Sequence, residues 1–118
     1  MQTLNILSPL SNNHKGYYQV YDWQTGKLGT WKSVVPNGIL IVEGVYSTRR
    51  ELRQYYDLTI FVSAKYETCL QRGMDRDGAS SKEKWTKEWM PEEMEYIGSE
   101  HDPRTSADIE IDGERIAT

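Results

Sequence analysis

A carboxylate at the end of an apolar run is the first residue of this sequence with a chemical role to explain. In "ILIVEGV", the residues from Ile39 to Val42 are followed directly by Glu43 and Gly44. A continuous, β-branched run predicts a strand over 39–43 that is buried on both faces of a parallel sheet. Ligands bind beyond the carboxyl ends of such strands, where a carboxylate can hold a hard cation such as magnesium through water. The alternative is that Glu43 caps the following helix or pairs with an arginine.

Two arginines form a second candidate constellation, in "RGMDRDG". Arg72 and Arg76 are four positions apart, so they project from one face of a helix near its C-terminal end. Two neighbouring guanidiniums repel each other unless an anion lies between them, and phosphate oxygens match their forked donors. The alternative is a solvated basic face whose arginines pair with nearby acids: Asp75, Asp77 or Glu67.

Aromatic side chains are concentrated in "YYQVYDWQTGKLGTW". Such side chains can stack on a flat ring, and Asp22 beside them can accept a hydrogen bond. Taken alone, however, the pattern is more typical of core residues. The aromatic residues of this segment are Tyr17, Tyr18, Tyr21, Trp23 and Trp31.

The N-terminal half is expected to hold few regular elements before the strand at 39–43. Leu4 to Leu10, interrupted by Pro9, fits either the last turns of a helix or a short helix, and a loop is expected to follow. Beyond the strand, Thr48 and Glu51 have the spacing of a capping box for a helix over 49–55.

The C-terminal half alternates strands and helices. We expect a strand over 58–63, a helix over 65–78, and a longer helical stretch over 80–100. In the last of these, Trp85, Trp89 and Met94 share a face, and Pro91 kinks the helix or starts a new one. Ile109 and Ile111 alternate with acids, which predicts an edge strand. The order predicts an α/β fold, a parallel sheet with flanking helices, in a single incomplete domain over 1–118.

Composition restricts the class of protein. The chain has 118 residues and a net charge of −4, which does not suggest a nucleic-acid surface. The single cysteine, Cys69, excludes an internal disulfide and fits a reducing compartment. No apolar run reaches the length of a membrane helix. We therefore expect a cytoplasmic protein with neither nucleic acid nor membrane as its partner.

Six ordered blocks together resemble a known family. "YDW", "ILIVEGV", "YDLTIFV", "CLQRGMDRDG", "W..EWMPEEMEYI" and "ADIEIDG" occur in the order seen in uridine kinase-like P-loop kinases. The chain is similar to the C-terminal part of these proteins, which transfer the γ-phosphate of ATP to a nucleoside 5′-hydroxyl.

The resemblance implies a role for each candidate residue. Tyr21, Asp22 and Trp23 fall in the loop that binds the nucleoside substrate. Glu43 falls on the catalytic acid near magnesium, with ATP and Mg²⁺ as the cofactors of the family. Arg72 and Arg76 fall on lid arginines that clamp phosphates, although "DGASSKEKW" lacks the further arginines that many relatives carry.

The phosphate-binding loop, or Walker A region, of the family is absent from this sequence. No G-x-x-x-x-G-K-[ST] occurs, so the cradle of backbone N–H groups and the phosphate lysine are missing. Because electrostatic positioning is most of phosphoryl-transfer catalysis, the chain alone is expected to be inactive. Its cofactors are then either Mg²⁺ and ATP, as the resemblance implies, or none in this chain.

Two functional hypotheses of different class follow, and a generic, unrelated α/β domain is a distant third. The first is a nucleoside-kinase-like chain that requires a complementary N-terminal half. The second is a non-catalytic α/β remnant that acts as a binding or interaction module. Open strand edges beside apolar side chains also predict self-association into a homo-oligomer.

Overall fold

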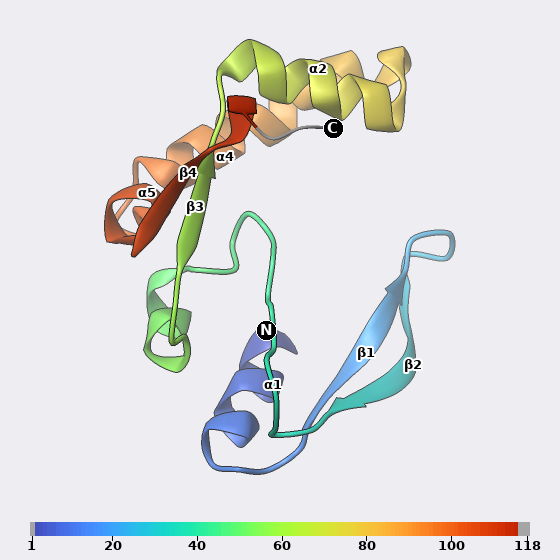
Figure 1. Cartoon of the computed structure of the whole chain (residues 1–118). Coiled ribbons are helices and arrows are strands. Elements are labelled where there is room, and N and C mark those ends of the chain that lie inside the picture. Colours follow the sequence, from blue (N-terminus) through green and yellow to red (C-terminus); the bar gives the residue numbers. More distant parts are fainter. Residues whose placement is uncertain (1, 116–118) are drawn as a thin grey trace. The chain divides into compact units, whose positions relative to one another are not determined.

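The computed structural model of the chain describes residues 2–115, which form two compact units. The first comprises the residues up to Ser47 together with Glu51–Tyr56, and the second comprises Thr48–Arg50 and the residues from Asp57 onward. The principal elements are α1 (Gln2–Ser11), β1 (Gly16–Asp22), β2 (Lys27–Val34), β3 (Ile60–Ser63), α2 (Tyr66–Asp77), α3 (Lys82–Lys84), α4 (Met90–Ile97), α5 (Pro103–Ser106) and β4 (Ile109–Asp112) (Figure 1).

The first unit is a helix packed on a β-hairpin. β1 and β2 pair antiparallel, where a loop had been expected from the sequence. α1 packs closely against β1 at Gly16: a Cβ atom on this residue would lie only 2.7 Å from the Cα of Ile6. The side chain of Gln2 adds a second tie: its amide donates to the carbonyl of Gln19 at 3.1 Å and accepts from the N–H of Gln19 at 2.7 Å.

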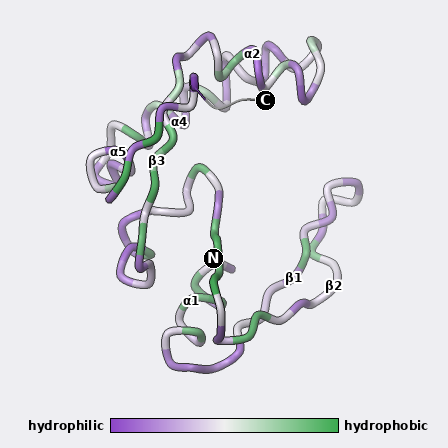
Figure 2. The backbone as a smooth tube through the Cα atoms, in the orientation of Figure 1, coloured by the Kyte–Doolittle hydropathy of each residue, from purple (hydrophilic) through white to green (hydrophobic). Residues whose placement is uncertain are grey.

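The strand predicted over 39–43 is not formed. This segment has no regular secondary structure and pairs with no strand among the described residues. Ile39 and Ile41 are 93% and 83% exposed, so the prediction of burial on both faces is also wrong. A strand requires a neighbour to accept and donate its backbone hydrogen bonds, and the apolar pattern by itself supplies none. Figure 2 colours this segment as hydrophobic.

The second unit contains the parallel pairing that the sequence predicted. β3 and β4 lie side by side in register, from Ile60 opposite Ile109 to Ser63 opposite Asp112 (Figure 1). The chain between them is helical, so a strand–helix–strand crossover is present, in a sheet of two strands. The α/β class is therefore confirmed, and the larger sheet with flanking helices remains a prediction.

Glu114, far away in the sequence, caps the start of α2. Its carboxylate accepts the backbone N–H of Lys65 at 2.6 Å and the hydroxyl of Thr68 at 2.9 Å. These hydrogen bonds to the charged form lower the pKa of Glu114. Gly113 makes this geometry possible, because a Cβ atom there would lie 2.6 Å from the carbonyl oxygen of Ser63.

The helical stretch after α2 changes pitch ahead of its proline. A π-helical turn, Trp85–Trp89, lies between α3 and α4, and Pro91 stands in the first turn of α4. Proline has no N–H to donate to the preceding turn, and the α-helical pitch resumes at Met90, directly before it, so a new α-helical segment starts here, one of the two outcomes predicted for Pro91. Trp85 and Trp89 stack edge to face with centroids 4.8 Å apart, whereas Met94 is 62% exposed.

The 3-10 turn Arg50–Tyr55 replaces the α-helix expected over 49–55. Its Leu52 is 1% exposed and is the most deeply buried side chain of the first unit. Among the described residues, the other buried large side chains are Leu7 in the first unit, and Met90 and Tyr96 in the second, each more exposed than Leu52. The core of each unit is therefore small.

The cap on α2 leads to a pH-dependent prediction. Because the pKa of Glu114 is lowered in the folded chain, its stabilising contribution is fully present above the unfolded-state pKa and is lost as the pH falls through the folded-state pKa. Glu114→Gln should lower the urea midpoint at neutral pH and have little effect well below pH 4.5, the ordinary value. Glu88→Gln, at an exposed position, is the matched control; an equal loss for both variants would contradict the cap.

We propose that copies of the chain associate through the exposed apolar segment Ile39–Ile41. A contiguous exposed patch of large aliphatic side chains is rare on monomers and marks association sites. Sedimentation should show a species heavier than 13.7 kDa, and the double change Ile39→Asp with Ile41→Asp should shift it toward that mass. Ser80→Asp, in an exposed turn, should have no effect. A wild-type chain that is monomeric at every concentration would rule the association out.

Candidate functional site

The residues predicted to bind a nucleoside lie at the tip of the β1–β2 hairpin. Tyr21 and Trp23 stack edge to face, with ring centroids 4.7 Å apart and planes at 76°. Trp23 is 87% exposed and Tyr21 is 43% exposed, so the structure contradicts the core interpretation of these aromatics. Trp31 on β2 is likewise exposed. Exposed, rigid rings of this kind are able to stack on a planar ligand.

Asp22 is committed to the turn of the hairpin. One carboxylate oxygen accepts the N–H of Gln24 at 2.8 Å and the N–H of Thr25 at 3.3 Å. The backbone carbonyl of Asp22 also accepts the N–H of Gly26, whose φ of 68° favours glycine. The two backbone hydrogen bonds lower the pKa of the Asp22 carboxyl, so it is a stable anion at neutral pH. Asp22 therefore shapes the loop that presents Trp23.

Glu43 is exposed and uncommitted. It precedes Gly44, whose φ is 145°, and a turn in which the N–H and hydroxyl of Ser47 both donate to the carbonyl of Gly44. Within residues 2–115, Glu43 itself makes no hydrogen bond or ion pair, so neither the helix cap nor the arginine pair considered from the sequence is observed. Its carboxylate is free for an external ligand.

Arg72, on α2, is tied to the fold. Its Nη1 donates to the carbonyl oxygen of Gly113 at 3.0 Å. That contact joins the middle of α2 to the end of the β4 segment, beside the Glu114 cap. Arg72 therefore has a structural hydrogen bond at one of its five donors, and the other donors have no hydrogen bond within the described part of the chain.

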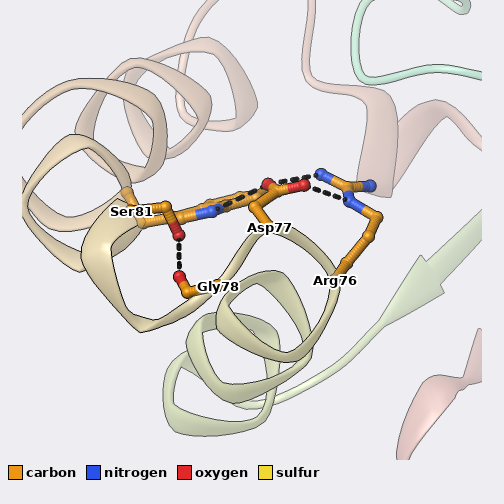
Figure 3. A network of polar contacts seen from close by, with 5 residues as sticks. Arg76, Asp77, Gly78 and Ser81 are labelled. Atoms are coloured by element: carbon orange, nitrogen blue, oxygen red, sulfur yellow. Dashed lines mark hydrogen bonds and ion pairs between the residues drawn. The ribbon is translucent and has the colours of Figure 1, made fainter.

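Arg76, one turn further along α2, is held by Asp77. Its Nε and Nη2 donate to the two carboxylate oxygens of Asp77 at 3.0 and 3.1 Å (Figure 3). Asp77 also accepts the indole N–H of Trp85 at 3.1 Å, and the guanidinium lies 5.5 Å from the centroid of a Trp85 ring. The pairing raises the pKa of Arg76 and lowers the pKa of Asp77. One alternative from the sequence, an Arg76–Asp77 pair, is thus observed.

The two arginines share α2 but have different partners. Arg72 contacts the β4 end of the unit, whereas Arg76 contacts Asp77 and Trp85. Sequence analysis named Asp77 only as an alternative partner and assigned Trp85 to a helix face. The spacing of Trp85 from Gly73 carries no recognisable signal, because the contact depends on how the chain turns after α2.

The geometry bears on whether the described residues could hold a metal ion by themselves. No group of three His, Cys, Asp or Glu side chains within residues 2–115 is arranged to hold a metal ion. Magnesium is commonly bound by one or two carboxylates together with waters and substrate phosphates. The free carboxylate of Glu43 fits that shared mode of binding, in which the phosphates supply the other ligands.

The class of protein follows from the fold and these residues. A strand–helix–strand crossover whose helix presents arginines, with an exposed acid after an apolar run, is an α/β protein with groups suited to phosphates. The family model described as "Phosphoribulokinase / Uridine kinase family" matches residues 2–97. The chain therefore belongs to this family.

The match includes every candidate site residue and ends at α4. The "ADIEIDG" block, which forms β4, lies outside it. No curated protein matches the chain. In the described part of the chain, no helix is both long and apolar enough to cross a membrane.

Proposed function

We propose that this chain supplies the substrate and phosphate contacts of an ATP-dependent nucleoside kinase. The observation that carries the proposal is the family match over residues 2–97, which contains all six candidate residues. The free carboxylate of Glu43 and the arginines of α2 support it, because an acid and two guanidiniums are the groups that a magnesium-bound polyphosphate requires.

Each residue has a distinct part in the proposed reaction. Glu43 would hold Mg²⁺ through water, and the metal would supply positive charge beside the phosphates. Arg72 and Arg76 neutralise charge on the transferring phosphate. Tyr21 and Trp23 stack against the base of the nucleoside, in the loop that Asp22 shapes.

The chain acts with a partner in this proposal. The cradle that holds the β- and γ-phosphates is supplied by a complementary N-terminal segment that carries the phosphate-binding loop. A second candidate function is a non-catalytic interaction module. The exposed apolar segment Ile39–Ile41 favours it, because such a surface is suited to protein contacts.

The first prediction of the proposal concerns the chain alone. It should phosphorylate neither uridine nor cytidine and should not hydrolyse ATP, because no loop in the sequence surrounds the phosphates with backbone N–H groups. A coupled ADP-release assay measures both activities. Turnover that Glu43→Gln abolishes would contradict the prediction, whereas turnover that this change leaves intact indicates a contaminating kinase.

The second prediction concerns reconstitution with a segment that carries the missing loop. Activity should return in part, and Arg76→Ala should lower kcat by about 10²- to 10³-fold, more than it raises KM, because the lost contact is made to charge that develops in the transition state. Glu43→Gln should also lower kcat, through the metal.

Matched controls are available for both substitutions. Lys82→Ala removes an exposed helical cation and Glu88→Gln removes an exposed acid, and both should leave kcat unchanged. If Arg76→Ala and Glu43→Gln behave as these controls in a reconstituted, active enzyme, the assigned roles are wrong. Reconstitution that never yields activity, with the segments bound to each other, would favour the interaction module.

A further inference from the structure

The Arg76–Asp77 pair uses only one edge of the guanidinium. Asp77 occupies the side-on edge, formed by Nε and Nη2. The end-on edge, formed by Nη1 and the second hydrogen of Nη2, makes no hydrogen bond within residues 2–115. Guanidinium carries five donors in a fixed fork, so a group bound at one edge leaves three donors for another. The free edge has the spacing to bind two oxygens of one phosphate.

Trp85 holds this pair from the side. The indole N–H donates to the Asp77 oxygen that also accepts Nη2, and a Trp85 ring lies beneath the Arg76 guanidinium. Gly73 allows the indole to approach α2: a Cβ atom there would lie 2.6 Å from Cε2 of Trp85. The orientation of Arg76 is therefore set by a carboxylate, an aromatic face and a glycine that no other residue can replace without displacement.

The exposure of the pair argues against a role in stability. The Arg76 side chain is 71% exposed, and solvent-exposed ion pairs contribute little to folding. Two hydrogen bonds and an aromatic ring beside the guanidinium are contacts of the kind that restrict the rotamers of a long side chain. A side chain that is already ordered loses less entropy when it binds a ligand.

We propose that Asp77 and Trp85 are positioning residues, which hold Arg76 so that its end-on edge receives a phosphate group of a polyphosphate ligand. The inference rests on the proposed function, since it takes Arg76 to be a phosphate contact. Asp77 and Trp85 act through Arg76 and touch no ligand themselves. The opposite role for Asp77, a competitor that phosphate must displace, is an outcome of the test.

The test uses substitutions that leave the charge unchanged. Trp85→Phe removes the indole N–H and keeps an aromatic ring, and Gly73→Ala pushes the indole away from α2. Gly98→Ala is the matched control, because the nearest atom to a Cβ there is 3.5 Å away and its φ of −83° suits alanine. Asp77→Asn is measured as well. It removes a negative charge in addition to the paired hydrogen bonds with Arg76, so it does not by itself test the positioning role.

The first measurement needs no ligand. In the ¹⁵N-labelled chain, the heteronuclear NOE at Arg76 Nε should be lower in Trp85→Phe and Gly73→Ala than in the wild type, and unchanged in Gly98→Ala. Circular dichroism confirms that each variant is folded, and Trp85→Phe carries the test if Gly73→Ala is not. An Arg76 Nε that is equally mobile in the wild type and in Trp85→Phe would overturn the proposal.

The second measurement is binding of inorganic tripolyphosphate to the same chains. The affinity should fall by about 2- to 10-fold in Trp85→Phe and Gly73→Ala, the amount expected for ordering one long side chain, and should be unchanged in Gly98→Ala. Arg76→Ala should lower the affinity for tripolyphosphate by at least the same factor.

The outcomes separate this inference from the proposed function. If Arg76→Ala binds as the wild type does, Arg76 is not a phosphate contact and both fail. If the wild type does not bind, the positioning inference fails, and the reconstituted enzyme decides the proposed function. If Arg76→Ala weakens binding but Trp85→Phe and Gly73→Ala do not, the phosphate contact stands and the positioning role is wrong. If, in addition, Asp77→Asn tightens binding, Asp77 is a competitor.

Discussion

The close approach of the Trp85 indole to Gly73 is the contact on which the arginine end of α2 depends. Only a residue without a Cβ atom allows it, since that atom would lie 2.6 Å from the ring. In this position the indole N–H donates a hydrogen bond to Asp77, and Asp77 in turn accepts hydrogen bonds from Arg76. Trp85 is also the first residue of the π-helical turn, which lies between α3 and α4.

The other end of α2 is fixed by the segment that follows β4. Glu114 accepts the backbone N–H of Lys65, and Gly113 accepts a hydrogen bond from Arg72. A carboxylate at the start of a helix is stabilised by the unpaired N–H groups and by the helix dipole. The two arginines of α2 thus have different partners: Arg72 ties the helix to the segment after β4, and Arg76 is bound by Asp77.

In the first unit too, some candidate residues are bonded within the fold and others are exposed to solvent. Asp22 is used by the turn of the hairpin, and its neighbour Trp23 is left in solvent. Glu43 makes no hydrogen bond or ion pair within the described chain, although it follows the apolar run Ile39–Val42.

The sequence by itself determined where several elements lie along the chain, because periodicity and breaker residues are local properties of a sequence. The apolar spacing and Gly78 placed α2 correctly, Pro91 placed the start of α4, and the alternation around Ile109 placed β4. The family also followed from the order of the motifs, because motif order needs no geometry.

Only the tertiary structure decided which of these groups meet. The hairpin was missed because an aromatic-rich segment fits a strand or a loop equally well until its partner is known. The strand over 39–43 was wrongly predicted because its pattern describes a buried environment, and burial depends on neighbours that a local pattern cannot specify. The cap from Glu114 and the Trp85–Asp77–Arg76 contacts join side chains whose separation in space is set by the path of the chain. Hydrogen bonds act over about 3 Å, so such contacts are determined by the packing and not by residue type.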